Sequence, residues 1–193
     1  VGFQVFLAHP EEVILLVFQS GEGLTADVGR KMGYAPEMTQ KGGILINLGG
    51  IGNGILLNSH VDTLGGMVAE IKSNGALRIT PVGGLNANNI ETENCRIYTY
   101  ENKCYTGTVQ LCDASLHVNG KYNDTIRTFD TIEVLLDEMS FSKKDTLDLG
   151  IMNGNYVCFD TRTIITDSGY IKSRFLDDKL STAILMGYAK YVK

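Results

Sequence analysis

The chain lacks any concentration of positive charge. Its 193 residues include 17 Lys and Arg against 22 Asp and Glu, which gives a formal net charge of −5 at pH 7. Proteins that bind nucleic acid neutralise its phosphates with Lys and Arg, so we expect no nucleic-acid partner. The length suits one domain or two small ones.

Long apolar runs are also missing. Residues 13–18 are apolar, but a helix that spans a bilayer needs about 20 such residues. The sequence shows no charged and then apolar leader either. We therefore expect neither a membrane partner nor a secretory signal.

The cysteines show no C-x-x-C spacing, which argues against a zinc knuckle or a redox motif. We expect reduced, structural thiols in a cytoplasmic protein, because disulfides are rare in that compartment. Cys95 and Cys104 flank a predicted hairpin turn, but spacing alone does not establish a bridge. The four cysteines are Cys95, Cys104, Cys112 and Cys158.

The glycine-rich segment 49–54 lacks the setting of a phosphate loop. It joins two strand-like runs, and no helix follows it, whereas a phosphate loop leads into the start of a helix. We interpret the segment as a turn.

The chain contains a short apolar run that is followed closely by His60-Val61-Asp62. Residues 55–57 read Ile-Leu-Leu, which is typical of a buried strand. In an α/β sheet the carboxyl end of such a strand faces the crevice where ligands bind. There His60 could bind a metal ion while Asp62 holds its other ring nitrogen. A histidine that is simply hydrogen-bonded at a strand end is the alternative, because short motifs often arise by chance.

Beyond this motif the pattern changes to short β-type runs. Hairpin turns at 73–75 and 101–103 separate some of them. Ser142 and Asp145 form a capping-box pattern that predicts a short helix ending at Gly150. Many short strands at close spacing predict a small barrel or sandwich. The predicted strands are 67–71, 76–80, 95–100, 104–109, 132–136 and 156–165.

Helical patterns lie on both sides of this β-rich segment. Residues 23–32 predict a helix that closes at a glycine, and an apolar helix begins at Leu180. Asp177 and Asp178 precede it, where the helix dipole favours carboxylates. They form an acidic first turn or, alternatively, metal ligands. The second helix has almost no polar face, which predicts burial in something larger, so we expect a chain that is cut short at Lys193 or completed by other material.

We expect residues 1–65 and 165–193 to form one α/β domain, into which a β-rich domain, residues 66–164, is inserted. This topology would bring His60 and Asp177 to one crevice, although they lie far apart in the sequence.

Six segments together resemble the M42 family of metallo-aminopeptidases, the glutamyl-aminopeptidase and TET-type group that also carries the older label endoglucanase M. They follow one another in a consistent order, which is more specific than any single short motif. The segments are 60–65, 67–75, 80–84, 105–108, 141–145 and 168–179.

The resemblance implies a two-metal exopeptidase that releases N-terminal residues from peptide substrates. His60 is similar to the family's imidazole ligand of one metal. Asp177 is similar to the carboxylate that bridges both metals, with a cis peptide to Asp178. Asp62 is similar to the catalytic carboxylate behind the histidine. The implied cofactors are two divalent ions, zinc or cobalt with manganese as the alternative, which activate a shared water.

The same resemblance implies an α/β metallopeptidase catalytic domain, a mixed sheet flanked by helices. An inserted small β-barrel or PDZ-like dimerisation domain would interrupt it. Homo-oligomers, from dimers to tetrahedral dodecamers, are the implied assemblies.

The sequence departs from the family pattern in three places. The family's Glu-Glu pair, a further acidic ligand and its final histidine fall beyond the position of Lys193, so we expect the 193-residue chain alone to be inactive. Residues 1–40 match poorly. Relatives often carry a histidine where Asp113 stands, and we assign no function to Asp113, to His117 or to His9.

Two other functions compete with this one. The chain could be a non-catalytic scaffold or interaction subunit, or an inactive fragment, that retains the M42 fold and only part of its ligands. A glycosidase, following the endoglucanase label, would need two carboxylates beside the scissile bond. A glycosidase would not explain why His60 and Asp62 occur together.

Overall fold

The computed structural model describes residues 13–18 and 23–193. The chain divides into two compact units, one formed by the part up to Asp62 together with Phe175–Lys193, and the other by Thr63–Arg174. The second unit therefore begins three residues earlier than the expected residue 66 and ends ten residues later than the expected residue 164. That the units are a catalytic and an inserted domain stays a prediction, and each unit is described by itself below.

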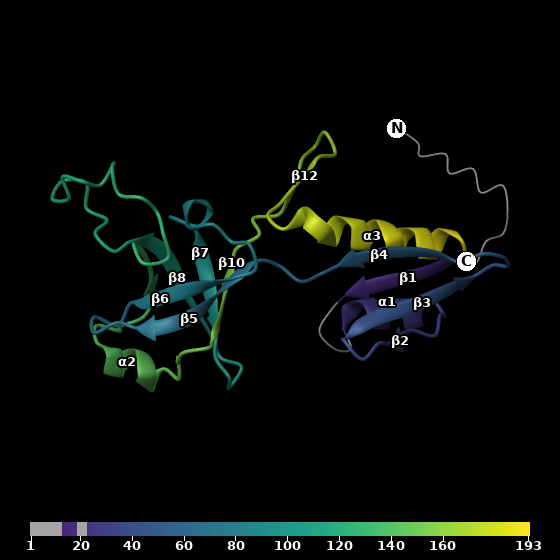
Figure 1. Cartoon of the computed structure of the whole chain (residues 1–193), viewed down its shortest axis with the longest axis horizontal. Helices are drawn as coiled ribbons and strands as arrows, with labels where there is room; N and C mark the ends of the chain where they lie inside the picture. Colours follow the sequence, from purple (N-terminus) through teal and green to yellow (C-terminus); the bar gives the residue numbers. More distant parts are fainter. Residues whose placement is uncertain (1–12, 19–22) are drawn as a thin grey trace. The chain divides into compact units, whose positions relative to one another are not determined.

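The first unit contains a mixed four-stranded sheet in the order β2-β3-β1-β4 (Figure 1). Strand β1 (Val13–Phe18) is antiparallel to β3 (Gly43–Gly49) and parallel to β4 (Ile55–His60). Strand β2 (Glu37–Met38) pairs with β3 at the other edge. The glycine-rich segment is indeed a connection between strands, and it joins two strands that β1 separates in the sheet.

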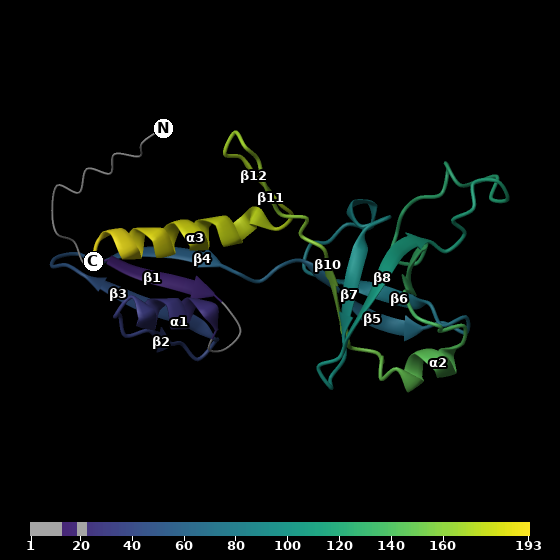
Figure 2. The ribbon, with the colours of Figure 1, turned by 180° about the vertical axis from the view of Figure 1, so that it is seen from behind.

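Two helices accompany this sheet, α1 (Leu24–Lys31) and α3 (Leu176–Tyr191) (Figures 1 and 2). Helix α1 begins after Gly23 and ends at Met32. Gly33 follows with a φ of +81°, the left-handed conformation that glycine adopts easily after a helix. The prediction of this helix and of its closing glycine is confirmed.

Helix α3 begins irregularly and is buried on one side. Phe175 has a φ of 59°, Asp177 and Asp178 have non-helical backbone angles, and the peptide bond between these two aspartates is cis, as the resemblance implied. Ala189 is fully buried, whereas Ile184 is 61% exposed. The helix is therefore not buried all round by the residues that the structure describes.

The core of the first unit lies between its helices and one face of its sheet. Its fully buried members come from α1, β3 and α3, and Leu57 of β4 packs against them. Leu56, by contrast, is 52% exposed. The expected strand is present, but in the described chain it is only partly buried, because α3 packs against one of its faces. The fully buried members are Ala26, Ile44, Ile46 and Ala189.

The second unit is a closed six-stranded barrel in the order β10-β5-β6-β9-β8-β7 (Figures 1 and 2). Buried and more exposed residues alternate along β7, β10 and the second half of β8, as the period of two in a strand requires, and Ile97, Val109 and Val134 are completely buried. Of the two predicted architectures, the barrel is the one observed. Its strands are β5 (Gly65–Ile71), β6 (Leu77–Val82), β7 (Asn94–Tyr98), β8 (Cys104–Leu111), β9 (Ile132–Leu136) and β10 (Tyr156–Phe159), with a 3₁₀ turn at Ala87–Asn89.

The predicted strand 156–165 is wrong in extent. Strand β10 ends at Phe159, and β11 (Ile164–Ile165) pairs with β12 (Ile171–Lys172) in a separate hairpin. Between them Arg162 has a φ of 51°, which interrupts the extended backbone.

Helix α2 (Lys143–Asp148) has the predicted cap. Ser142 Oγ accepts a hydrogen bond from Asp145 N at 3.2 Å, and Asp145 Oδ2 accepts one from Phe141 N at 3.1 Å. Hydrogen bonds to the carboxylate from the Ser142 side chain and from Phe141 N favour its charged form and lower the pKa of Asp145. Gly150 follows the helix with a φ of +86°.

All four cysteines are free thiols. Cys95 lies opposite Gly107 and Cys104 lies opposite Tyr98 in the pairing of β7 with β8, so the two sulfurs belong to different pairs. Of the helices in the described part of the chain, none is long and apolar enough to cross a membrane.

Candidate metal site

The three predicted site residues lie together in the first unit. His60 is the last residue of β4, Asp62 follows two positions later, and Asp177 lies in the first turn of α3. His60 Nε2 is 3.5 Å from Asp177 Oδ1, and His60 Nδ1 is 3.3 Å from Asp62 Oδ1. The imidazole therefore lies between two carboxylates, and the prediction that His60 and Asp177 approach each other is confirmed.

These side chains do little to stabilise the fold. The exposed fractions are 95% for the side chain of Asp177, 77% for Asp62 and 40% for His60. Ion pairs this accessible to water contribute about 0–1 kcal/mol. The three side chains are therefore better explained as groups that bind a ligand than as groups that stabilise the fold.

The donors fit a divalent metal ion. Two ligands of one tetrahedral zinc, each about 2.1 Å from the ion, lie about 3.4 Å apart, close to the separation of His60 Nε2 and Asp177 Oδ1. His60 Nδ1 is buried and makes no hydrogen bond to any residue that the structure describes. Asp62 Oδ1 lies 3.3 Å from this nitrogen, which is where a carboxylate that orients a metal-bound imidazole would stand.

His60 and Asp177 alone do not complete a metal site. Among the side chains that the structure describes, no group of three or more His, Cys, Asp or Glu is arranged to hold a metal ion. Zinc sites use three or four protein ligands. The roles of His60 and Asp177 as ligands, and of Asp62 as a catalytic carboxylate, stay predictions.

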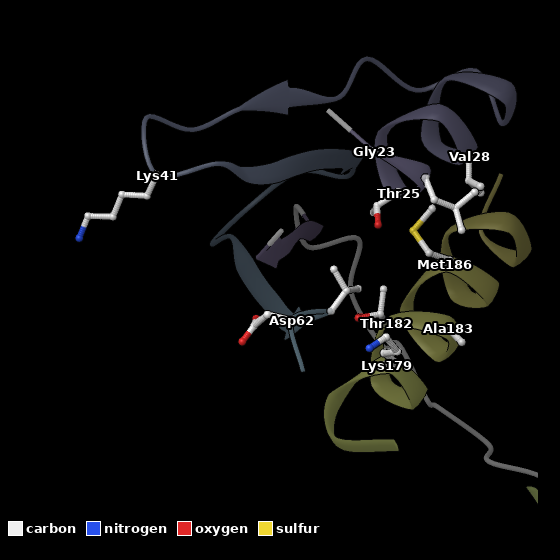
Figure 3. Close-up of a pocket in the computed structure, with 11 residues that line it drawn as sticks. Gly23, Thr25, Val28, Lys41, Asp62, Lys179, Thr182, Ala183 and Met186 are labelled. Carbon is white, nitrogen blue, oxygen red and sulfur yellow. The ribbon is translucent and has the colours of Figure 1, made fainter. Parts of the chain in front are cut away.

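A cavity of about 950 Å³ opens beside Asp62 within the first unit. Figure 3 shows Asp62 at the end of β4, with Thr182 and Met186 on α3 and Val28 on α1 around the cavity, while Lys41 extends away from the others. Its size is that of a small-molecule or peptide pocket. The cavity adjoins the candidate metal site through Asp62.

Two buried hydroxyls beside the site were missed by the sequence analysis. Ser59 and Thr182 are 3% and 7% exposed. Thr182 Oγ1 donates to Ser59 Oγ at 2.9 Å and lies 3.3 Å from His60 O and 3.4 Å from Asp178 O. In the sequence Ser59 precedes His60, and Thr182 follows Asp178 by one helical turn, but these positions alone do not indicate that the two hydroxyls meet.

Of the two remaining histidines, the structure describes one. His117 lies in the second unit, in the loop between β8 and β9. In the same loop Asn119 Nδ2 donates to Asp113 O at 2.8 Å. His9 lies outside the described residues.

Two solved structures share the fold of this chain. The structure matches "Aminopeptidase APDkam598 from the archaeon Desulfurococcus kamchatkensis" with a TM-score of 0.75 and 19% identity, covering 90% of this chain and 49% of that one. It matches the TET1 peptidase of Pyrococcus horikoshii with a TM-score of 0.69 and 19% identity, covering 90% and 52%. At these identities the likeness shows a shared fold.

The sequence then identifies the family. The profile of the M42 glutamyl aminopeptidases matches residues 42–193, and the chain belongs to this family. It is 46% identical over 148 residues to a Bacillus subtilis (strain 168) protein named "Putative aminopeptidase YhfE", covering 76% of this chain and 43% of that protein. The chain thus spans about half the length of the relatives it matches.

Proposed function

We propose that the protein containing this chain is a metal-dependent aminopeptidase that removes N-terminal residues from peptides. The observation that carries the proposal is the 3.5 Å separation of His60 Nε2 and Asp177 Oδ1 in a member of an aminopeptidase family. The 46% identity to a relative named as an aminopeptidase supports it. The proposed cofactors are two divalent ions, zinc or cobalt, with manganese as the alternative.

Each site residue has a distinct role in this proposal. His60 would hold a metal ion through Nε2, and Asp177 would supply a carboxylate to the metal ions beside it. Asp62 would accept a hydrogen bond from the Nδ1–H of His60, which fixes the tautomer that leaves Nε2 free to bind. When bound, the metal ions polarise the scissile carbonyl and lower the pKa of a shared water. Further ligands, in addition to these, are needed for a complete site.

We also propose that the first unit is the catalytic α/β domain and that the barrel is an inserted domain that mediates assembly. The contrast between a mixed sheet with helices and a closed barrel supports this division. The TET1 peptidase of Pyrococcus horikoshii, whose fold the chain shares, can assemble into a tetrahedron or a large octahedral shell. A homo-oligomer is therefore proposed here as well.

An assay of the native protein that contains these residues tests the activity. We expect it to hydrolyse aminoacyl-p-nitroanilides, to lose this turnover after treatment with a chelator, and to regain it with added zinc or cobalt. The matching N-acetylated substrates should stay intact, because an aminopeptidase recognises a free amino group.

A pair of histidine variants makes the assay specific. His60→Ala should abolish turnover, whereas His117→Ala, in a loop of the second unit, should keep it. An absence of metal-dependent turnover in the wild-type protein would reject the enzyme in favour of a scaffold that retains the fold.

A further inference from the structure

We propose that Ser59 and Thr182 are positioning residues that hold His60 and Asp177 at the separation a shared metal ion requires. The inference rests on the proposed function, since it concerns the same site. Neither hydroxyl is expected to touch the metal or the substrate. Both would act through the backbone segments that carry the ligands.

The two hydroxyls connect those two segments directly. Ser59 is the residue before His60 in β4, and Thr182 lies one helical turn after Asp178 in α3. Thr182 Oγ1 is 2.9 Å from Ser59 Oγ, 3.3 Å from the backbone oxygen of His60 and 3.4 Å from that of Asp178. The side chain of Thr182 therefore contacts the main chain of His60, one predicted ligand, and the main chain of Asp178, which is next to Asp177, the other predicted ligand.

Burial makes this contact strong enough to set the geometry. Ser59 and Thr182 are 3% and 7% exposed, so water cannot easily replace either partner, and a buried polar group left unpaired is costly. A hydroxyl has one proton to donate, so Thr182 Oγ1 donates to one acceptor at a time, and its shortest contact is the one to Ser59 Oγ at 2.9 Å.

The ligands themselves are too exposed to fix their own separation. The side chain of Asp177 is 95% exposed, and α3 begins with non-helical backbone angles at Asp177 and Asp178. Thr182 makes a buried polar link between β4 and this irregular turn. Loss of that link should let the turn shift relative to His60, and shifts of this kind in groups that orient metal ligands lower metal affinity about 10- to 100-fold.

The test is a cobalt titration of the native protein, followed by the visible absorption of bound Co²⁺ and by calorimetry. Thr182→Val keeps the shape of the side chain and removes the hydroxyl. We expect it to weaken Co²⁺ binding about 10- to 100-fold and to alter the Co²⁺ spectrum. Thr182→Ser restores the hydroxyl, and we expect affinity within a few-fold of the wild type.

A matched control separates positioning from general stability. Thr146 is also completely buried, and its hydroxyl donates to Gly75 O at 2.9 Å in the second unit. Thr146→Val should lower the resistance to urea and leave Co²⁺ affinity unchanged.

The results of the titration test the positioning role of Thr182 separately from the proposed metal-dependent activity. Wild-type affinity and spectrum in Thr182→Val would overturn the positioning role and leave the metallo-aminopeptidase proposal standing. Equal weakening in Thr182→Val and Thr146→Val would also overturn it, because the effect would then be general. A wild-type protein that binds no Co²⁺ or Zn²⁺ would overturn both.

Discussion

At the scale of single residues, burial separates the four thiols. Cys95 is 1% exposed, and burial raises its pKa to about 12, whereas Cys104, Cys112 and Cys158 are exposed. The thiolate is the reactive form. We expect iodoacetamide at pH 8 to label the exposed cysteines of the native protein and to spare Cys95, as read by peptide mass spectrometry. All four should react after unfolding, and labelling of native Cys95 at the rate of Cys104 would contradict the buried assignment.

The same thiol predicts a dependence of stability on alkaline pH. The folded pKa of Cys95, about 12, lies above its ordinary value of 9.0, so the folded state retains a proton that the unfolded state loses. This contribution to the free energy of unfolding is fully present below pH 9 and is lost as pH rises toward 12. Urea unfolding at pH 8 and pH 11 should show a larger loss of stability in the wild type than in Cys95→Ala. Equal losses in the two proteins would refute the effect.

The sequence indicated only those site residues whose side chains are typical metal ligands or their carboxylate partners. His60 and Asp62 end an apolar run, and Asp177 stands before a helix, so residue type and position indicated them. Ser59 and Thr182 are small polar residues whose link depends on the packing of α3 against β4. No pattern along the sequence shows such a tertiary contact.

At the scale of elements, β8 passes so close to β9 that one position of β8, Gly107, has no room for a side chain. A Cβ at Gly107 would lie 2.5 Å from Leu135 O and 3.0 Å from Val134 Cγ1 in the neighbouring β9. The carbonyl belongs to the sheet backbone and cannot move away freely. Gly107→Ala should therefore lower the free energy of unfolding by about 1–3 kcal/mol, measured by urea denaturation.

Gly84 provides the control for this substitution. A Cβ there would meet nothing within 4 Å, so Gly84→Ala should change stability by less than about 0.5 kcal/mol. An effect of Gly107→Ala no larger than that of Gly84→Ala would show that β8 and β9 have room to adjust.

Elements with local signals were predicted well, and those without were not. Helices α1 and α2 have capping residues that the sequence displays, and glycine or asparagine turns mark the hairpins. The break between β10 and β11 was missed because Ile164 and Ile165 continue the apolar character of β10. The change of direction lies in the backbone at Arg162, whose φ of 51° is uncommon for a residue other than glycine.

At the scale of the whole molecule, the sequence predicted a β-rich segment between two parts of an α/β unit but not its details. Closure of six strands into a barrel and their order depend on pairings between distant strands, such as β10 with β5. The boundary of the second unit after Arg174, beyond the expected 164, reflects the β11–β12 hairpin. Both features depend on contacts that no local pattern encodes.

The central claim is that His60 and Asp177 bind a common metal ion. The most direct measurement is the zinc content per chain of the native protein, determined by elemental mass spectrometry after gel filtration. It should be compared with the content of His60→Ala, Asp177→Asn and the control Asp113→Asn from the second unit. We predict about two zinc ions in the wild type and in Asp113→Asn, and the loss of at least one in each site variant. Undiminished zinc in both His60→Ala and Asp177→Asn would contradict the account.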